Sequence, residues 1–401
     1  MPKVIVVGAG PAGIMSSLSA SKKNEVILID RNNEIGKKLK LTGGGRCNIT
    51  NNRSMERFLE KIVTNKKFLY SALYTFSNED LLLYFRNNNL EYKVEYDEKV
   101  YTKSDRAEEV IEVLKRDLLK NEVRTFYNTK IEDLIVEDGK INGVITDKGE
   151  KILGDKVIIA TGGKSHPNTG SDGSMYEIIK RYGHTITDIY AALIPLVIKE
   201  GFIKNLQGIS MKEVVFSTKI KKKKIEITGD MIFAHFGLSG PGVLKFSSHI
   251  TKLLKEGEVV ISLDFLKDIS KEELSRIIRK NSKSIASNLK GYLPNNFIKE
   301  ILTILNLTET KVAELKKVDE LKLIEYIKEM KLTVTETITI KAAMVTSGGI
   351  KVKEINSSTM ESRIIKDLYF AGEVMDVDGE TGGFNLQIAF STGTLAGRLG
   401  E

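Results

Sequence analysis

Short apolar runs separated by polar turns open this chain. Val4 to Val7 is a β-branched run that predicts a buried strand, and Val26 to Ile29 predicts a second strand that ends on Asp30. The residues between them, from Ile14 to Leu18, follow a glycine-rich turn and predict a helix. The first thirty residues therefore predict a strand–helix–strand unit.

Helical and β-rich blocks alternate further along the chain. Apolar positions at helical spacing predict two helices over residues 56–90 and another helix that starts at Ser104-Asp105. Strand alternation with short turns predicts a β-meander over residues 123–159, which ends at Thr161-Gly162-Gly163. That last turn is a second place where backbone could approach a cofactor.

A change of pattern past Ala192 predicts an inserted region. Residues 193–265 have the pattern of short strands, residues 268–330 have a helical pattern, and residues 332–341 alternate again. This order predicts a barrel-like domain that carries a helical subdomain. The predicted domains are a discontinuous one over residues 1–192 and 343–401, a β-barrel-like one over 193–267 and 331–342, and a helical subdomain over 268–330.

The turn after the first strand carries the first candidate chemistry. It reads Gly8-Ala9-Gly10-Pro11-Ala12-Gly13, a G-x-G-x-x-G between strand and helix. Gly8 allows the turn, Gly10 lets backbone approach a pyrophosphate, and Gly13 lets helix and strand pack closely. The helix N-terminus offers free N–H groups to phosphate, and Asp30 can accept from ribose hydroxyls. The pattern favours a dinucleotide site over a purely structural turn.

Two further glycine clusters lie where backbone could approach a ligand. Thr42-Gly43-Gly44-Gly45-Arg46-Cys47-Asn48 has polar side chains around three glycines, which favours a loop that covers a cofactor over a flexible surface loop. Gly382-Gly383 precedes a predicted helix from Ile388 to Leu399. The positive end of that helix dipole could stabilise negative charge on a reduced flavin ring.

Composition narrows the class of protein. The 401 residues can form two or three domains, and the formal net charge is +8. Cys47 is the one cysteine, which excludes an intrachain disulfide and favours a small buried residue over a reactive thiol. Lys221 to Lys224 favours a solvated hairpin tip over a nucleic-acid patch. No apolar run reaches the ~18 residues of a membrane span and no signal peptide is evident, so we expect a cytoplasmic protein.

These motifs together resemble one known family. The glycine turn, the Gly43–Asn48 loop, His235-Phe236-Gly237-Leu238-Ser239-Gly240-Pro241, Met360-Glu361-Ser362 and the segment Ala371–Gln387 are similar to the bacterial BaiN-like (YhiN-like) NAD(P)/FAD-dependent oxidoreductases, from end to end of the chain. The resemblance implies an α/β fold of three-layer ββα architecture, with a glutathione-reductase-type Rossmann domain that binds FAD. It also implies an inserted β-barrel and a small helical domain.

The resemblance also implies which residues meet FAD. The implied cofactor-binding residues are Gly8, Gly10, Pro11, Ala12 and Gly13 at the pyrophosphate, Asp30 and Arg31 at the adenosine, Lys130 and Ile131 at adenine, Thr161 and Gly162 near the pyrophosphate, Lys38, Thr42, Gly43, Gly44, Arg46, Cys47 and Asn48 along the middle and flavin end, Gly372, Glu373 and Asp376 at the ribityl and phosphate, and Gly383, Asn385, Leu386 and Gln387 at the flavin.

Three departures from the family pattern bear on these assignments. Asp30 stands where glutamate is commoner, which shortens the reach to the ribose but keeps the acceptor. Tyr101-Thr102 replaces a usual Phe-Pro pair, which leaves the conformation of that segment open. Ser174 and Met175 replace the family's Asp and Gly, which leaves open whether the loop from Thr169 to Tyr176 meets the cofactor.

Several functions are compatible with these residues. A second dinucleotide turn and a redox cysteine pair are both missing, which excludes a two-nucleotide disulfide reductase. The first hypothesis is an enzyme that takes hydride from NAD(P)H and reduces a small organic acceptor, such as an activated C=C bond. The alternatives are an amine or hydroxyl oxidase that uses oxygen, and a flavoprotein that binds nucleic acid. His235 is the candidate catalytic acid–base group, against a histidine that only orders its loop. We expect a small-molecule substrate rather than a nucleic-acid partner, and no metal; the oligomeric state stays open.

Overall fold

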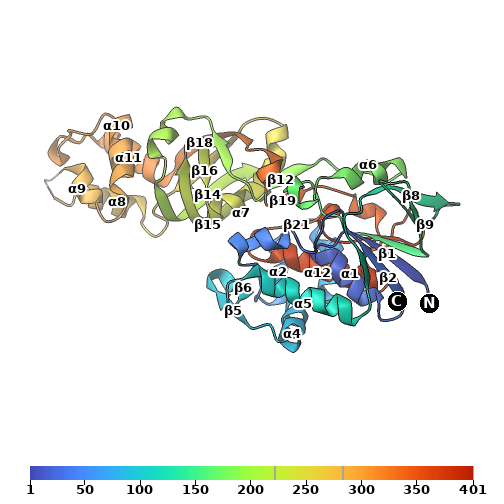
Figure 1. Ribbon diagram of the computed structural model, residues 1–401. Helices are drawn as coiled ribbons and strands as arrows, with labels where there is room; N and C mark the ends of the chain where they lie inside the picture. The colour runs from blue at the N-terminus through green and yellow to red at the C-terminus, as the bar shows by residue number, and fades with distance from the viewer. Residues whose placement is uncertain (221–222, 282–283, 401) are drawn as a thin grey trace. The chain divides into compact units, whose positions relative to one another are not determined.

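The computed structural model describes residues 1–220, 223–281 and 284–400 (Figure 1). The chain divides into two compact units, each of which is described here by itself. The first combines Met1–Ala191 with Ile340–Glu401, so it is built from both ends of the sequence. The second is the intervening segment Ala192–Thr339.

A five-stranded parallel sheet forms the centre of the first unit. Its order is β20 (Leu368–Phe370), β11 (Lys156–Ile159), β1 (Lys3–Val7), β2 (Glu25–Ile29) and β7 (Arg124–Phe126). The apolar runs predicted as strands are these strands, and Val4, Ile5 and Val6 have no exposed surface. Burial on both faces is what a continuous apolar run in a parallel sheet requires.

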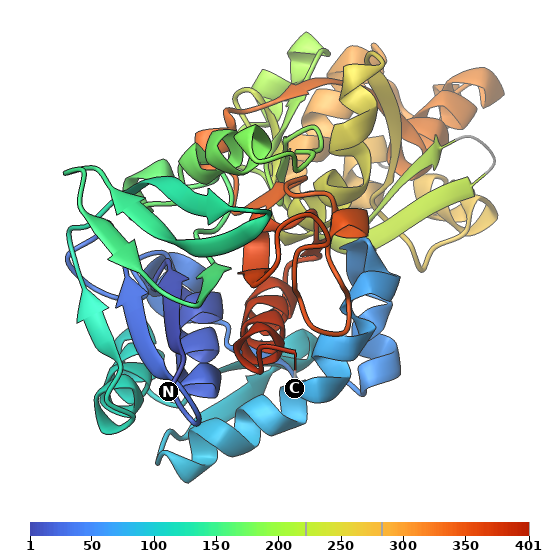
Figure 2. The same ribbon diagram turned by 90° about the vertical axis from the view of Figure 1, so that its right-hand side faces the viewer.

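Layers on both faces cover this sheet (Figure 2). One face carries an antiparallel sheet, and the other carries long helices. The antiparallel sheet consists of β8 (Ile131–Glu137), β9 (Lys140–Thr146) and β10 (Lys151–Leu153), and the helices are α1 (Pro11–Ala20), α5 (Ala107–Lys120) and α12 (Phe384–Gly397). The predicted three-layer α/β fold is therefore confirmed.

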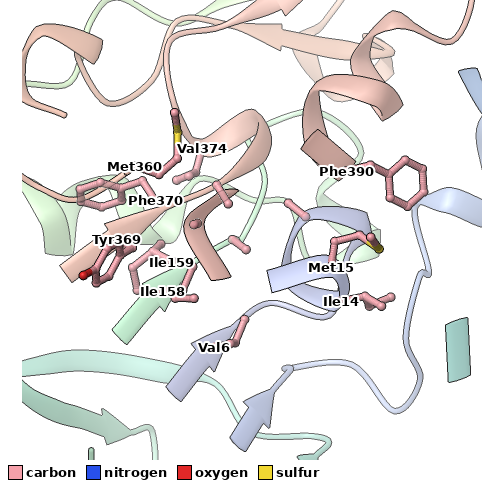
Figure 3. Close-up of a cluster of buried hydrophobic side chains, with 14 of the residues drawn as sticks. Val6, Ile14, Met15, Ile158, Ile159, Met360, Tyr369, Phe370, Val374 and Phe390 are labelled. Carbon is pink, nitrogen blue, oxygen red and sulfur yellow. The ribbon is translucent and has the colours of Figure 1, made fainter. Parts of the chain in front are cut away.

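Helices α1 and α12 pack very closely, although they lie at opposite ends of the sequence. A Cβ on Gly393 would lie 2.2 Å from the carbonyl oxygen of Ala12, and one on Gly397 would lie 2.4 Å from that of Ser16. Figure 3 shows part of the core around them, in which Met15, Ile159 and Phe370 are among the buried side chains. The two glycines of α12 thus allow the C-terminal helix to pack against the first one.

Short elements complete the first unit. They are β3 (Thr50–Asn51), α2 (Met55–Leu59), β4 (Ile62–Thr64), α3 (Tyr70–Thr75), α4 (Asn78–Asn87), β5 (Tyr92–Glu95), β6 (Lys99–Thr102), α6 (Ser174–Arg181), β12 (Tyr190–Ala192), β19 (Val345–Ser347) and β21 (Asp378–Gly379). The prediction of two helices over residues 56–90 is wrong. A short strand, β4, pairs with β21, and Ser77 begins a separate helix through a capping box with Asp80.

The second unit contains the predicted barrel and helices. The strands β13 (Leu196–Ile198), β16 (Gly237–Ser239), β15 (Lys223–Ala234), β14 (Ser210–Ile220), β17 (Val259–Asp264) and β18 (Met330–Thr337) close in that order. The helices are α7 (Pro241–Ile250), α8 (Lys271–Ile278), α9 (Ile285–Leu289), α10 (Asn295–Ile304) and α11 (Lys317–Lys328). Phe233, Phe265 and Phe297 pack together where barrel and helices meet. Of the lysine run, Lys221 and Lys222 lie outside the described residues.

Three predicted boundaries differ in the structure. The helix expected from Ser104-Asp105 begins at Ala107, because Asp105 has a left-handed φ of 60°. The last helix begins at Phe384, four residues before the predicted Ile388, directly after the left-handed Gly383. The stretch 123–159 is not one meander, since β7 and β11 at its ends belong to the parallel sheet. Among the described residues, none of the helices has the length and apolar character that crossing a bilayer requires.

Candidate functional site

A pocket in the first unit follows the carboxyl ends of β1, β2 and β11 and the start of α12. Ligands of open α/β sheets bind at this edge. The implied cofactor residues that line it are Gly8, Gly10, Pro11, Ala12, Asp30, Arg31, Lys38, Thr42, Lys130, Ile131, Thr161, Gly162, Glu373, Asn385 and Leu386. Segments that are more than three hundred residues apart in sequence thus form one site.

The glycines of the turn have different roles: Gly8 and Gly13 allow close backbone packing, whereas Gly10 leaves open space. Gly8 has a φ of +105°, and a Cβ there would lie 2.5 Å from the carbonyl oxygen of Ala160. A Cβ on Gly13 would lie 1.8 Å from the carbonyl oxygen of Gly8. A Cβ on Gly10, by contrast, would meet no protein atom within 4 Å, and Gly10 lines the pocket. The space above Gly10, beside the N-terminus of α1, is where a pyrophosphate fits.

Asp30 closes the end of β2 and is 9% exposed. Its Oδ2 accepts from the Ala9 amide at 2.5 Å, and its Oδ1 accepts from the backbone and side chain of Asn32 at 2.7 and 2.9 Å. Burial raises the pKa of Asp30, and these hydrogen bonds oppose the rise. A carboxylate has about four lone-pair sites, so Asp30 can still accept from a hydroxyl in the pocket.

Glu373 and Lys38 form a partly buried ion pair in the pocket wall, with side chains 20% and 23% exposed. Glu373 Oε2 lies 2.7 Å from Lys38 Nζ, which also donates to Ser165 Oγ at 2.7 Å. Glu373 Oε1 accepts from the Thr346 amide at 2.7 Å and from Ser165 Oγ at 3.0 Å. Burial alone raises the pKa of Glu373, but the Lys38 ammonium and the hydrogen bonds lower it overall. The carboxylate is therefore charged and fixed.

The loop of three glycines lies mostly outside the pocket lining. Cys47 is fully buried with a φ of 55°, and burial raises the pKa of its thiol to about 12. A thiol with that pKa carries almost no thiolate near neutral pH, so the preference for a buried, unreactive residue holds. Gly43 and Gly44 have φ values of 60° and 68°, the left-handed conformation that favours glycine.

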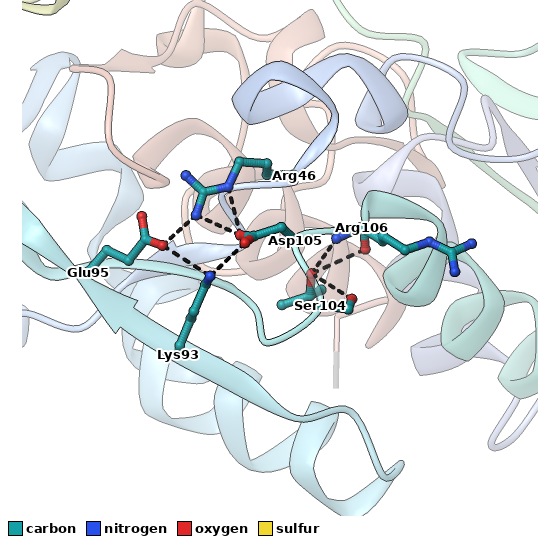
Figure 4. A network of polar contacts seen from close by, with 7 residues as sticks. Arg46, Lys93, Glu95, Ser104, Asp105 and Arg106 are labelled. Atoms are coloured by element: carbon teal, nitrogen blue, oxygen red, sulfur yellow. Dashed lines mark hydrogen bonds and ion pairs between the residues drawn. The ribbon is translucent and has the colours of Figure 1, made fainter.

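Arg46 and Asn48 use their side chains within the protein. Figure 4 shows Arg46 bound to Glu95 and Asp105, with the Arg46 Nε to Asp105 Oδ1 distance at 2.7 Å. Its guanidinium lies 4.1 Å above the ring of Tyr101. Asn48, with its amide oriented to satisfy its neighbours, donates to the carbonyl of Thr50 and accepts from the Gly383 amide. These contacts tie the loop to β3, β6 and the start of α12.

The remaining implied residues also lie beside the pocket rather than in its lining. Gln387 is fully buried. Its Oε1 accepts a hydrogen bond from Thr50 Oγ1, and its Nε2 donates to the Phe76 carbonyl and to Ser391 Oγ. Asp376 accepts from the side chain of Asn65. Gly13, Gly372 and Gly383 allow close backbone packing, with Gly383 lying against the Thr50 backbone. These residues lie behind the lining and hold the segments that form it.

The sequence alone does not decide whether the loop from Thr169 to Tyr176 meets the cofactor. Thr169 to Met175 lines the pocket, although Ser174 and Met175 depart from the family pattern. Ser171 Oγ and Thr161 Oγ1, both in the lining, are buried without a hydrogen-bond partner among the described residues. Unpartnered buried hydroxyls fit a ligand with polar groups. Lining residues that sequence reasoning missed include Asn32, Thr129, Met344, Val345, Val377 and Ala389.

His235 lies in the second unit, in the tight turn between β15 and β16, and is exposed. Its ring contacts Phe236 edge-on at 5.1 Å. Ser239 does not cap the following helix, because Gly240, with a φ of 103°, is the residue before Pro241. Whether His235 takes part in catalysis stays a prediction.

One family model and several known proteins match nearly the whole length of this chain. The model of the HI0933-like protein Rossmann domain matches residues 2–399. The chain is 30% identical to a 3-dehydro-bile acid delta(4,6)-reductase of Clostridium scindens over 99% of this chain and 98% of that protein. It is 28% identical to a ribosomal RNA dihydrouridine synthase of Escherichia coli over 97% of this chain and 95% of that protein.

Solved structures support the fold. A 3-ketosteroid delta1-dehydrogenase from Sterolibacterium denitrificans matches with a TM-score of 0.53 and 12% identity, over 99% of both chains. A 3-ketosteroid-delta4-(5alpha)-dehydrogenase from Rhodococcus jostii matches with a TM-score of 0.51 and 13% identity, over 99% of this chain and 96% of that one. With the family match across nearly every residue, the resemblance seen in the motifs is confirmed: the chain belongs to the HI0933-like Rossmann family, the BaiN-like group of FAD-dependent oxidoreductases.

Proposed function

We propose that this enzyme uses NAD(P)H to reduce a carbon–carbon double bond conjugated to a carbonyl group. The observation that carries the proposal is the pocket, which runs from the open space at Gly10 to the N-terminus of α12. FAD bound there would supply hydride transfer between the nicotinamide and the acceptor. The one cysteine is buried and unreactive, so a disulfide acceptor on this chain is excluded.

The residues of the pocket suit the parts of FAD. The α1 N-terminus and the space above Gly10 would hold the pyrophosphate, and Asp30 would accept from the ribose. Thr161 and Ser171 offer unpartnered hydroxyls along the middle. The amides at the start of α12, at Asn385 and Leu386, would stabilise negative charge at the flavin end. The residues behind the lining, among them Arg46 and Gln387, would keep these groups in place.

The names of two relatives support the acceptor class. A delta(4,6)-reductase and a dihydrouridine synthase both add two hydrogens across a carbon–carbon double bond near a carbonyl. The balance is one hydride and one proton gained by the acceptor, with NAD(P)⁺ as the oxidised product. NAD(P)H is the electron source in this proposal, and the proton comes from solvent or from a protein acid.

We expect NADH or NADPH to bleach the holoenzyme under anaerobic conditions. The physical reason is that a nicotinamide can stack transiently on an exposed flavin face without a Rossmann domain of its own. Stopped-flow absorbance of the visible flavin band measures the rate with each nucleotide, and reoxidation by a conjugated enone then tests the acceptor.

The oxidase alternative predicts a different result. No bleaching by either nucleotide, together with peroxide release from an amine or an alcohol in air, would reject the reductase and support the oxidase.

A second candidate acceptor is a uridine in RNA. The relatives named ribosomal RNA dihydrouridine synthases, from E. coli and Haemophilus influenzae, are 28% identical over 97% of this chain. The charge distribution also favours a polyanion. The segment Ala192–Thr339 carries 25 Lys and Arg against 18 Asp and Glu, whereas the rest of the chain carries 36 against 35. Nearly all of the positive excess thus belongs to the inserted unit, which suits phosphate contacts.

We also propose His235 as the proton donor to the reduced acceptor. We expect His235→Asn to slow acceptor turnover by about 10²–10⁴-fold while flavin bleaching by NAD(P)H keeps its rate, because a general acid acts only in the second half-reaction. Slowed reoxidation of the reduced flavin by the acceptor, with unchanged bleaching, supports the role. An unchanged rate of reoxidation would leave His235 with only a structural part.

A further inference from the structure

A short helical run behind α12 presents Lys67, Tyr70 and Tyr74 to solvent, with Lys66 half-buried beside them. Residues 66–75 form a continuous helical run, a 3₁₀ turn at Lys66–Leu69 followed by α3. Its inner face is fully buried and consists of Leu69, Ala72 and Leu73. The outer face carries the residues that we name the Tyr–Lys stripe: Lys66, Lys67, Tyr70 and Tyr74.

The stripe exposes flat aromatic surface next to unneutralised charge. Tyr70 is 41% exposed and Tyr74 is 60% exposed, and their i, i+4 spacing places the two rings on one face of the helix. Within residues 1–220, 223–281 and 284–400, no carboxylate lies within ion-pair distance of Lys66 or Lys67. The surface has aromatic faces and cations but no exposed aliphatic side chain, which is unlike an interface for an apolar protein partner.

Hydrogen bonds at both ends of the helical run fix it against residues that lie behind the pocket lining. Before it, Asn65 Nδ2 donates to the Asp376 carbonyl at 2.6 Å, and the next residue, Val377, lines the pocket. After it, the Phe76 carbonyl accepts from Gln387 Nε2 at 3.2 Å and from Ser391 Oγ at 2.6 Å. These partners belong to α12, whose first turn lines the pocket. Helix α12 and the buried inner face of α3 thus lie between the pocket and the stripe, which places the stripe about two helix diameters, roughly 20 Å, from the pocket.

We propose that the Tyr–Lys stripe binds single-stranded RNA that flanks the reduced base; this inference rests on the RNA form of the proposed function. Tyrosine rings stack on unpaired bases of any sequence, and lysines bind the backbone phosphates. An enzyme that acts on a base must take it out of its stack, so contacts to other nucleotides of the same strand hold the RNA in place. The stripe supplies both kinds of contact for nucleotides that lie a few positions from the reduced base.

Binding of a fluorescein-labelled, uridine-containing RNA oligonucleotide, followed by anisotropy on the holoenzyme, tests the stripe. We expect Y70A/Y74A to weaken binding by at least about tenfold, because each stacked base contributes a several-fold gain in affinity. We expect K66A/K67A to lower the slope of log K against log salt by about 1.4, the value for two phosphate contacts on a single strand. A duplex of the same sequence should bind more weakly than the single strand.

Matched variants elsewhere on the surface separate the stripe from general effects. Y96A removes an exposed tyrosine elsewhere in the first unit, and K115A/K120A removes two exposed lysines of α5; both should bind RNA within twofold of the unchanged protein. Flavin content and thermal unfolding of every variant identify any fold defect.

Any of three results would overturn the proposal. One is equal RNA affinity of the unchanged protein and Y70A/Y74A, and another is equal affinity for duplex and single strand. A protein that binds no RNA at about 0.05 M salt would also reject it. Bleaching by NAD(P)H and reduction of a small enone would persist in each of these cases, so they distinguish a wrong stripe from a wrong reductase.

Discussion

Gly10→Val yields a folded protein that does not retain FAD. The valine Cβ would meet no protein atom within 4 Å, and Gly10 has an ordinary φ of −80°, so the apoprotein accommodates the side chain. The same atoms would occupy the space above the α1 N-terminus that a pyrophosphate needs. We expect FAD affinity to fall more than a hundredfold, about 2.7 kcal/mol or more. Flavin content after purification and titration of the apoprotein with FAD measure the loss.

Two other glycines make this result specific. Gly201→Val places the same side chain at a glycine that also has open space but lies in the second unit, and it should keep its FAD. Gly13→Ala should instead destabilise the apoprotein itself, because its Cβ would lie 1.8 Å from the carbonyl oxygen of Gly8. A yellow Gly10→Val protein with unchanged affinity would place the pyrophosphate elsewhere.

Glu373→Gln should cost the apoprotein about 2–3 kcal/mol of unfolding free energy at neutral pH. The substitution keeps the size of the side chain but leaves the Lys38 ammonium without its counter-charge in a wall where both side chains are less than a quarter exposed. Breaking a fully buried pair costs about 3–5 kcal/mol, and partial exposure reduces that figure. Urea unfolding of the apoprotein measures the difference. Glu60→Gln, at an exposed carboxylate, should change stability by less than about 0.5 kcal/mol.

The same pair gives a pH dependence with a definite sign. The pKa of Glu373 is lower in the folded protein than its ordinary value of 4.5. Its stabilising contribution is therefore complete above that value and is lost as the pH falls through the folded pKa. The glutamine variant has no such titration, so the gap between the two proteins should narrow below about pH 4.5. A gap that stays constant from neutral to acid pH would contradict a charged Glu373.

Local patterns were sufficient to predict the elements that depend on neighbouring residues. The turn from Gly8 to Gly13 and the strand before it could be predicted, because an apolar run, a glycine spacing and a helix start are all contiguous. The start of α12 was placed four residues late, because Gly383 rather than a polar capping residue begins the helix. Strand β4 was missed because its partner, β21, lies more than three hundred residues away.

The polar contacts in the pocket wall could not be predicted from the sequence, because their partners are also far apart along the chain. Lys38 and Glu373 were each expected near the cofactor, but nothing local indicates that they pair with each other. The residues that fix the pair, Ser165 and Thr346, come from two more segments and have no motif around them. Ser171 could have been suspected from its loop of small polar residues, although the departure at Ser174 obscured that signal.

The discontinuity of the first unit sets an order of events during synthesis. The glycine turn leaves the ribosome long before residues 368–389, and until those residues have been made the central sheet lacks β20 and the pocket lacks one wall. All of Ala192–Thr339 emerges in between, with its own hydrophobic core. The inserted unit can therefore fold before the unit that surrounds it in sequence. FAD can be captured only after α12 has been translated, so the nascent chain carries its dinucleotide turn for most of synthesis without a site to close over it.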